Sequence, residues 1–502
     1  MKRPLFQSHI AAAILAVLTA GSVLLTACSG GGNSADTTAS PSGGTAETAE
    51  TGITLPASHL PTDVKFDGSD FTFLITGNTE NNWRKNDFLA EEQNGEILND
   101  ARFLRNQAVE ERFGVNIKTI EQYGSAKGAG SGFQLITKSV LAADSAYDAG
   151  MVAGYDVCNL ACAGYLYDFN SLPYLDLENE WWDQKANADM TIKGRMFFTT
   201  GDISTADNDA TCCIIFNKKL VGDFKLDNPY ELVDSGAWTF DAMTAMGKPV
   251  SADLDGNGTF DKNDRFGSIV WDDSIMAAVN GSLIKCGTVN ADGEIELTLY
   301  SERLINIIDK YTAYVYDKSL SYTYQRVSYD ITDPVNMFSN DQALFFMQML
   351  DLTSYFRDMQ TDFGILPYPK YDEKQTSYGH TIGSWHSTFL CVPAVIESAD
   401  MTGIVLEALA AESLDKVTPA YYDKTLIGKY FRDEESVAML DIILSTRVYD
   451  LGWYYQLGLY NDEILYLVYE FDTDFASRYA KHETKALEDV KRINTTFAEN
   501  VG

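Results

Sequence analysis

Short apolar runs alternate with stretches of helical periodicity from about residue 66 onward. The run FTFLIT (71–76) predicts a strand, and a polar loop follows it. Apolar residues then recur at steps of four, three and four positions, as on one face of a helix: Ile97, Ala101, Leu104 and Ala108. This helix is expected to stop at Gly114.

The same alternation continues to residue 154. The pattern predicts a strand over 115–120, a helix over 133–144 and a strand over 147–154. Strand–helix–strand alternation predicts a parallel α/β sheet with right-handed crossovers. Because ligands bind beyond the carboxyl ends of the strands in such sheets, the loops that contain Trp83 and Tyr155 are the first places to look for a site.

The pattern starts again downstream. A helix is expected from about residue 240, with Thr239 as its N-cap and Asp241 favourably placed in its first turn. A strongly apolar helix is expected over 401–413, and the C-terminal quarter is helical and rich in tyrosine. The strand-like segments of this part are 212–219, 265–271, 342–350 and 362–369, and the segment 386–398 precedes the apolar helix.

Length and charge narrow the class of protein. The chain has 502 residues, more than one core usually holds, so at least two lobes are expected. Its 72 acidic and 38 basic residues give a net charge of −34, which argues against nucleic acid and against adsorption to anionic lipid. The cysteines other than Cys28 form no C-x-x-C motif and no zinc-like spacing, so buried free thiols are favoured and no disulfide is specified.

The N-terminus predicts export. Charged residues precede an apolar run that ends in LTAC, which is typical of a secretory signal over 1–27. The stretch 25–28 resembles the lipobox of bacterial lipoproteins, which implies a lipid on Cys28 and a protein held at the extracellular face of the membrane. An uncleaved transmembrane anchor is the alternative. Residues 28–59 are small and polar and predict a flexible tether.

The stretch DLDGNGTFDKND (253–264) concentrates carboxylates in one loop. Oxygen ligands fall at positions 1, 3, 5, 7, 9 and 12 of a calcium-type loop, with a backbone carbonyl at position 7: Asp253, Asp255, Asn257, Thr259, Asp261 and Asp264. Gly258 allows the sharp turn, and hard oxygen ligands suit Ca²⁺. The final Asp replaces the usual Glu, as in dockerin-type loops. The alternative is an acidic turn that binds no metal.

Taken in order, these segments resemble a known family. The lipobox and tether, NDARFLRNQAVEERFGVNI, YDAGMVAG, CCIIFNKKL, WTFDAM, ALFFMQML, DFGILPYPKYDE and HSTFLCVPA are similar to the extracellular solute-binding proteins of bacterial ABC importers, in the class typified by maltose-binding protein. The resemblance covers about residues 66–500. It implies a type II, two-lobed α/β fold of the periplasmic-binding-protein kind, with a ligand cleft that closes by a hinge motion.

The resemblance also implies lobes and ligand residues. Lobe one would take 60–170 and 334–384, and lobe two 171–333 and 385–502. Sugar clefts combine aromatic rings with acids and amides. By position, the ligand-binding candidates are Asn82, Trp83, Tyr155, Asp156, Asp209, Trp271, Asp272, Gln348, Asp351, Trp385 and Trp453. Packing remains the alternative for Trp83 and Trp453, and helix capping for Asp156 and Asp272.

The function implied is that of a monomer with no catalytic residues, which captures a sugar or oligosaccharide and delivers it to ABC permease subunits. A glycoside-active enzyme is an alternative, although no G-x-S-x-G, H-E-x-x-H or P-loop motif occurs. A surface glycan-binding protein without a transport role is a second alternative, and a peptide or other metabolite as cargo is a third. His380 and His386 lack an obvious third histidine for a transported metal ion.

Overall fold

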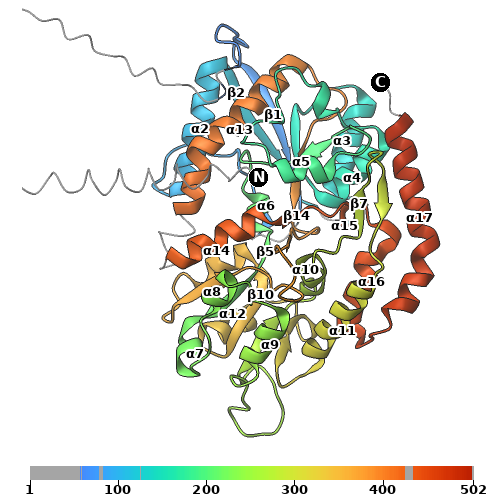
Figure 1. The fold of residues 1–502 in the computed structure, drawn as a ribbon. Helices are drawn as coiled ribbons and strands as arrows, with labels where there is room; N and C mark the ends of the chain where they lie inside the picture. Colours follow the sequence, from blue (N-terminus) through green and yellow to red (C-terminus); the bar gives the residue numbers. More distant parts are fainter. Residues whose placement is uncertain (1–56, 58, 79–82, 125, 424–433, 500–502) are drawn as a thin grey trace, which may run out of the picture. The chain divides into compact units, whose positions relative to one another are not determined.

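Figure 1 shows the protein as a computed structural model that describes residues 57, 59–78, 83–124, 126–423 and 434–499. The signal segment 1–27, Cys28 and Asn82 lie outside these residues, as does the tether 28–59 apart from Ala57 and His59. In the described part, no helix combines the length and the apolar character that a membrane span needs.

The first sheet has the strand order β2-β1-β3-β13-β4. Its strands are β1 Ser69–Ile75, β2 Val115–Glu121, β3 Ala149–Ala153, β4 Phe198–Thr199 and β13 Thr388–Cys391. Strand β1 runs parallel to β2 and β3, whereas β13 runs antiparallel to β3 and β4. The predicted parallel arrangement is therefore correct for the first three strands, but the sheet is mixed because a strand from late in the chain inserts beside β3.

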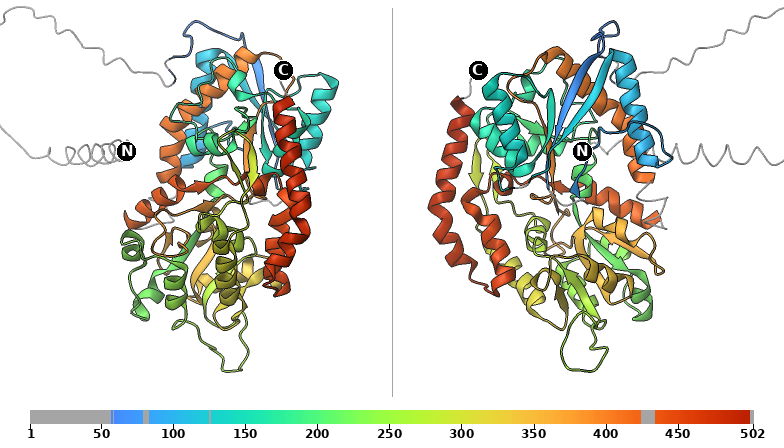
Figure 2. Two further views of the ribbon diagram at one scale, coloured as in Figure 1. Left: turned by 45° about the vertical axis from the view of Figure 1, so that its right-hand side comes forward. Right: turned by 180° about the vertical axis from the view of Figure 1, so that it is seen from behind.

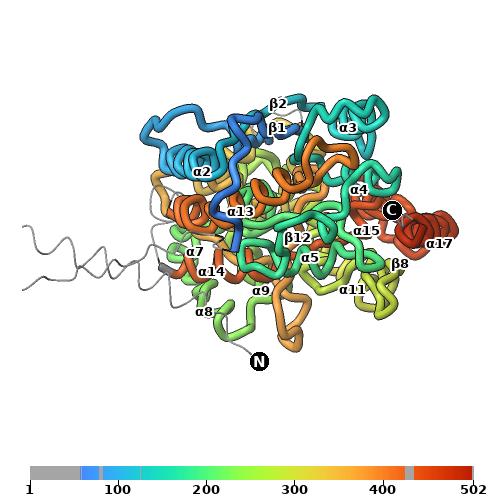
Figure 3. The backbone as a smooth tube through the Cα atoms, turned by 90° about the horizontal axis from the view of Figure 1, so that it is seen from above, coloured from blue at the N-terminus to red at the C-terminus, as the bar shows by residue number. Residues whose placement is uncertain are grey.

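Helices cover both faces of this sheet. They are α2 Ile97–Phe113, α3 Ser131–Ala142, α4 Gly154–Ala163 and α13 Ala399–Tyr422. Because side chains of a strand alternate between faces, Phe71 and Phe73 join the core with α2 and α13, whereas Leu74 joins the core with α3 and α4. Helices α2 and α13 lie side by side (Figure 3). As predicted, α2 ends at Gly114, whose φ of 65° is left-handed.

The second sheet has the order β11-β5-β10-β6-β9. Its strands are β5 Cys212–Asn217, β6 Phe266–Val270, β9 Ser321–Thr323, β10 Ala343–Met349 and β11 Phe363–Leu366. Strand β10 is parallel to β6 and antiparallel to β5, and all of its residues are buried. Helix α9 (Phe240–Gly247) begins as predicted, since the Thr239 side chain accepts a hydrogen bond from the Ala242 N–H.

The remaining elements are short or peripheral. The helices are α5 Gln184–Met190, α6 Ala206–Asp209, α7 Lys218–Asp223, α8 Pro229–Asp234, α10 Ser274–Gly281, α11 Glu302–Tyr316, α12 Thr332–Ser339, α14 Glu434–Ser445, α15 Leu451–Tyr454, α16 Tyr460–Glu470 and α17 Phe475–Glu499. The short strands are β7 Gly287–Val289, β8 Ile295–Leu297, β12 His380–Thr381 and β14 Arg447–Val448.

Two chain segments run together between the sheets. Thr211 and Ile382 form an isolated antiparallel bridge, and the Gly383 N–H donates to the Ala210 carbonyl at 2.9 Å. The chain thus leaves the first sheet just before β5 and returns to it just before β13.

The sheets do not divide the chain at the expected lobe boundaries. Strands β10 and β11 come from 334–384, which was assigned to lobe one, yet they pair with β5 in the second sheet. Strands β4 and β13 come from segments assigned to lobe two, yet they pair in the first sheet. Sequence position alone did not reveal this, because buried apolar strands fit either sheet equally well.

The last helix, α17, contacts both halves of the molecule (Figure 2). Near its C-terminal end, the Phe497 ring lies 5.2 Å from that of Phe197, which precedes β4 of the first sheet. Near its N-terminal end, the Tyr479 ring lies 4.6 Å from that of Tyr300, which precedes α11. Helix α17 therefore lies along one side of the molecule and contacts residues near both sheets.

Candidate binding site between the two sheets

A turn over 383–387 lies where the chain passes from the second sheet to the first. On one side the Gly154 N–H, at the start of α4, donates to the Ser387 carbonyl at 3.1 Å. On the other side, a Cβ at Gly383 would lie 3.0 Å from the Met349 sulfur at the end of β10. The turn is thus held between the carboxyl end of β3 and the carboxyl end of β10, where α/β folds place their ligands.

Three rings from three separate segments meet at this turn. The His386 ring lies 4.5 Å from that of Trp83, in the loop after β1, and 5.7 Å from that of Trp271, directly after β6. Burial lowers the pKa of His386 to about 3, so its imidazole is neutral at physiological pH. The result is an aromatic cluster with an uncharged polar ring at its centre.

Two nitrogens of this aromatic cluster are buried without a partner. Among the described residues, neither His386 Nδ1 nor Trp271 Nε1 has a hydrogen-bond partner. Trp271 itself is only 3% exposed. A buried polar group without a partner typically costs about 1–3 kcal/mol, so a ligand or water that pairs with these nitrogens would stabilise the site.

A second group lies on the other side of the same turn. The Tyr155 hydroxyl is 2.7 Å from Ser384 Oγ and accepts a hydrogen bond of 3.2 Å from Asn461 Nδ2. The Trp385 ring lies 6.3 Å from the Tyr155 ring. Asn461 is 1% exposed, and in the described part its Oδ1 atom has no hydrogen-bond partner. This group therefore adds an unpaired acceptor to the unpaired nitrogens.

Two adjacent acids follow Trp271. The Asp272 carboxylate accepts hydrogen bonds from the Tyr469 hydroxyl and, at 3.0 Å, from the Asp273 N–H. Asp273 is half-buried and its side chain makes no capping bond to α10. Burial and the neighbouring Asp272 raise the pKa of Asp273 above its ordinary value. Burial raises the pKa of Asp272 as well, so these two carboxyl groups ionise less readily than exposed ones, and any charge that they carry at the end of the second sheet is negative. We call Trp83, Tyr155, Trp271, Asp273, His386 and Asn461 together the seam site.

An ion-pair link ties the two sheets together beside the seam site. Lys85 comes from the loop after β1, and its Nζ lies 2.7 Å from Asp351 and 3.1 Å from Asp209. Burial lowers the pKa of Lys85, but the two carboxylates outweigh it, and the pKa lies above its ordinary value. Asp209 also accepts a hydrogen bond from the Tyr421 hydroxyl at 3.1 Å.

The ligand candidates from the sequence fall into three groups. Trp83, Tyr155 and Trp271 contact the turn 383–387, Trp385 belongs to it, and Asp272 directly follows Trp271. Asp209 and Asp351 also lie there, but both are engaged by Lys85. That any of these residues binds a ligand stays a prediction.

Three candidates have local partners instead. The Asp156 carboxylate accepts hydrogen bonds from the N–H groups of Gly130 and Phe133, at 2.9 and 3.3 Å, and so caps α3. Trp453 is buried, and its indole donates to Asn280 Oδ1 at 3.2 Å. The Gln348 amide donates to the Tyr324 hydroxyl at 3.2 Å. Capping and packing, the alternatives kept for Asp156 and Trp453, account for these contacts.

Sequence reasoning missed Lys85, Asp273, Ser384 and Asn461, and it considered His386 only as a metal ligand. His380 was considered with it. In the structure His380 Nε2 accepts from the Tyr368 N–H at 2.9 Å, and Nδ1 lies 2.8 Å from Thr446 Oγ1. His380 is therefore a core histidine with both nitrogens paired. The one signal for the missed group was the crowded polar stretch GSWHS at 383–387.

The acidic loop 253–264 is a candidate metal site that is separate from the seam site in the sequence. One ligand oxygen from each of Asp253, Asp255 and Asp264 lies within 4.8 Å of the others, and these form the one such group found among the described residues. Asp264 is buried, and its carboxylate accepts hydrogen bonds from the N–H groups of Leu254 and Asp261 at 2.8 and 2.9 Å. The donor set is all oxygen, which fits Ca²⁺.

Backbone N–H groups hold the rest of the loop. The Asp253 carboxylate accepts from Gly256 and Gly258, at 2.7 and 2.8 Å, and these bonds lower its pKa. Both glycines have positive φ, 72° and 82°, which other residues adopt rarely. The side chains of Asn257 and Asp261 likewise accept backbone hydrogen bonds, from Thr259 and Asn263 respectively.

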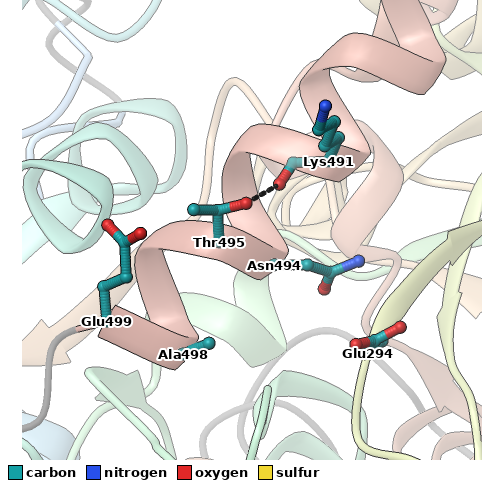
Figure 4. Close-up of a pocket in the computed structure, with 6 residues that line it drawn as sticks. All are labelled: Glu294, Lys491, Asn494, Thr495, Ala498 and Glu499. Atoms are coloured by element: carbon teal, nitrogen blue, oxygen red, sulfur yellow. Dashed lines mark hydrogen bonds between the residues drawn. The ribbon is translucent and has the colours of Figure 1, made fainter.

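A separate surface pocket of about 450 Å³ lies along the end of α17 (Figure 4). Two of its polar side chains hydrogen-bond to backbone groups of the protein. The Asn494 side chain pairs with both the N–H and the carbonyl of Ile295, each at 2.9 Å, and the Thr495 hydroxyl donates to the Lys491 carbonyl at 2.8 Å. None of the residues predicted to bind a ligand lies in this pocket. It is therefore a poorer candidate than the seam site.

Comparison with known proteins identifies the fold. No family model and no curated protein matches the sequence. Among solved structures, an ABC substrate-binding protein of Listeria monocytogenes in complex with cycloalternan is similar, with a TM-score of 0.52 and 14% identity over 86% of this chain and 100% of that chain. The chain thus has the two-lobed, type II periplasmic-binding-protein-like fold.

Two further structures agree. A cyclo/maltodextrin-binding protein complexed with maltotetraose has a TM-score of 0.52 and 12% identity, over 87% of this chain and 100% of that chain. UgpB of Mycobacterium tuberculosis, in complex with glycerophosphocholine, has a TM-score of 0.51 and 15% identity, over 86% and 99%. At such identities the similarity shows the fold, and the site must be argued from the residues of this chain.

Proposed function

We propose that this protein is an extracellular solute-binding protein that captures a sugar or oligosaccharide and delivers it to an ABC importer. The observation that carries the proposal is the set of buried, unpaired polar atoms in the seam site: Trp271 Nε1, His386 Nδ1 and Asn461 Oδ1. A sugar hydroxyl both donates and accepts hydrogen bonds, so one ligand class satisfies this mixed set.

The aromatic residues support the same ligand class. Trp83, His386 and Trp271 offer ring faces at the turn between the two sheets. Sugar rings have flat C–H faces that pack on such rings. The ligands in two structures of similar fold, cycloalternan and maltotetraose, are saccharides. The site contains no arrangement that we assign to catalysis, and we propose a binding role.

The proposal includes two features that come from the sequence. The LTAC stretch supports a lipid on Cys28 and a tether over 28–59, which would keep the protein beside its permease at the extracellular face. The loop 253–264 supports a bound Ca²⁺, with Asp253, Asp255, Asn257, Thr259, Asp261 and Asp264 as its ligands. When bound, the ion would neutralise clustered carboxylates and brace the loop.

A thermal-shift screen against a library of neutral mono- and oligosaccharides tests the function. We expect one sugar class to raise Tm and to be recovered unchanged from the complex. Scattering should show compaction on binding, as expected when two lobes close over a ligand. Turnover of the sugar would indicate an enzyme, and binding without compaction would favour a glycan-binding protein that does not serve a transporter. If no sugar binds, the proposed function is wrong.

A further inference from the structure

Negative charge gathers around the seam site from several elements. Asp272 and Asp273 follow β6, and Asp462 lies on α16 close enough to raise the pKa of Asp273. Asp209 and Asp351 lie beside Lys85 at the edge of the seam site. These carboxylates come from different parts of the chain, so the charge belongs to the site and not to one acidic loop.

Among the described residues, four cations lie near these acids, and each has at least one partner. Lys127 pairs with Asp462, and Lys85 is held between two carboxylates. Arg84 lies over the Tyr123 ring, at 5.4 Å. Arg326 donates to the Val468 carbonyl and lies over the Phe471 ring, and its Nε has no hydrogen-bond partner among the described residues. When all are ionised, the five acids named above exceed these four cations by one, so the net charge of the group is negative.

Asp273 differs from the other acids because its carboxylate is not committed. Asp272 accepts from Tyr469, and Asp462 pairs with Lys127. In the described part of the chain no hydrogen bond to the Asp273 carboxylate occurs, and its side chain is half-buried. Asp273 lies two residues after Trp271, whose buried indole N–H is also unpaired among the described residues. These two groups together point to a ligand position and not to a solvated acidic surface.

We propose that the seam site accepts uncharged and amine-bearing sugars and excludes anionic ones, and this inference rests on the proposed function. The physical reason is that a sugar carboxylate, sulfate or phosphate entering here would meet Asp273 and Asp272, whereas Lys85 and Lys127 are already paired with carboxylates. A ligand ammonium would instead pair with Asp273 and face the rings of Trp271 and Trp83. The neutral His386 adds no positive charge that would offset this.

Titration calorimetry with matched sugars tests the inference on the full folded chain. Each neutral oligosaccharide of the thermal-shift library is measured with its uronate form and its amino form. We expect every binder to be neutral or amine-bearing, and each uronate to bind at least about tenfold more weakly than its neutral counterpart. A uronate that binds as tightly as its neutral form overturns the inference but leaves the proposed function intact. A library with no binder at all overturns both.

Charge-neutralising variants test which carboxylates weaken the binding of uronates. Asp273→Asn should reduce the neutral-to-uronate affinity ratio by about tenfold, and Asp462→Asn should reduce it in the same direction. Asp292→Asn, an exposed acid in the turn between β7 and β8, is the matched control and should leave the ratio unchanged. If Asp273→Asn and Asp462→Asn both fold, as judged by their circular dichroism, and both leave the ratio unchanged, the inference is contradicted.

Discussion

Acidic residues gather in two regions of this protein, and the two regions differ in how the acids are held. In the loop 253–264, neighbouring backbone N–H groups hold the carboxylates, and the whole arrangement comes from one stretch of sequence. In the seam site, the side chains come from five places: the loop after β1, the start of α4, the end of β6, the turn before β13, and α16. The loop is satisfied locally, whereas the seam site has buried polar atoms left unpaired.

This difference indicates which of the two regions is expected to bind a ligand. A local loop can form wherever its sequence occurs, so its presence says little about what the whole protein does. The seam site exists only when both sheets have folded and met, and its unpaired atoms carry an energetic cost that a ligand can offset. The loop is therefore expected to affect stability, and the seam site binding.

The largest effect is expected from Lys85→Met, which breaks the link between the sheets. Two half-buried carboxylates, Asp209 and Asp351, would lose their shared cation. Removal of one partner from a buried ion pair typically costs about 3 kcal/mol. Urea unfolding should show a decrease in the free energy of unfolding of that order. An unchanged free energy would show that the link contributes nothing to stability.

Truncation of an aromatic residue should separate binding from stability. Trp83→Ala removes a half-buried ring of the seam site and should weaken sugar affinity by roughly thirtyfold, a value typical of a lost stacking contact. Trp453→Phe is the control, since Trp453 packs in the core beside Asn280. The control should lower Tm and leave affinity unchanged. If Trp453→Phe impairs binding as much as Trp83→Ala does, the seam site is wrongly placed.

A pH series on His380→Gln tests the core histidine. Burial lowers the pKa of His380 to about 3, below its ordinary value of 6.5, so the unfolded state binds more protons between these values. Protonation of His380 in the unfolded state therefore lowers the free energy of unfolding of the wild type. This decrease is absent above about pH 7.5 and reaches about 1.4 kcal/mol at pH 5.5. The stability difference between wild type and variant should shrink by this amount as the pH falls. A constant difference would contradict the neutral, buried state.

The smallest effect is expected in the acidic loop. Calcium at 0.5 mM should raise Tm by roughly 2 °C for a site of about 0.1 mM affinity, and EDTA should reverse the shift. Asp255→Ala should abolish the shift without altering sugar affinity, whereas Asp292→Ala should retain it. If calcium changes neither Tm nor metal content, the loop is an acidic turn that binds no metal.

The local elements of this protein follow from the amino-acid sequence alone. The strands at 71–76, 115–120 and 147–154 form close to their predicted bounds, and the caps at Thr239 and Gly114 form as expected. Each of these follows from contacts within a few residues. The fold class was also predicted, through the order of the segments and the family that they resemble, and the solved structures of similar fold confirm it.

Which strands share a sheet, and which side chains share a site, depends on tertiary packing. Strands β10 and β13 are buried apolar runs that fit either sheet, and their placement depends on partners far away in sequence. Asn461 carries no local signal, and the polar stretch 383–387 marks His386 only as part of a crowded turn. Both become site residues through Trp271 and Tyr155 beside them. Short-range periodicity fixes helices and strands, but a site assembled from distant segments is fixed by the packing of the sheets that bring them together.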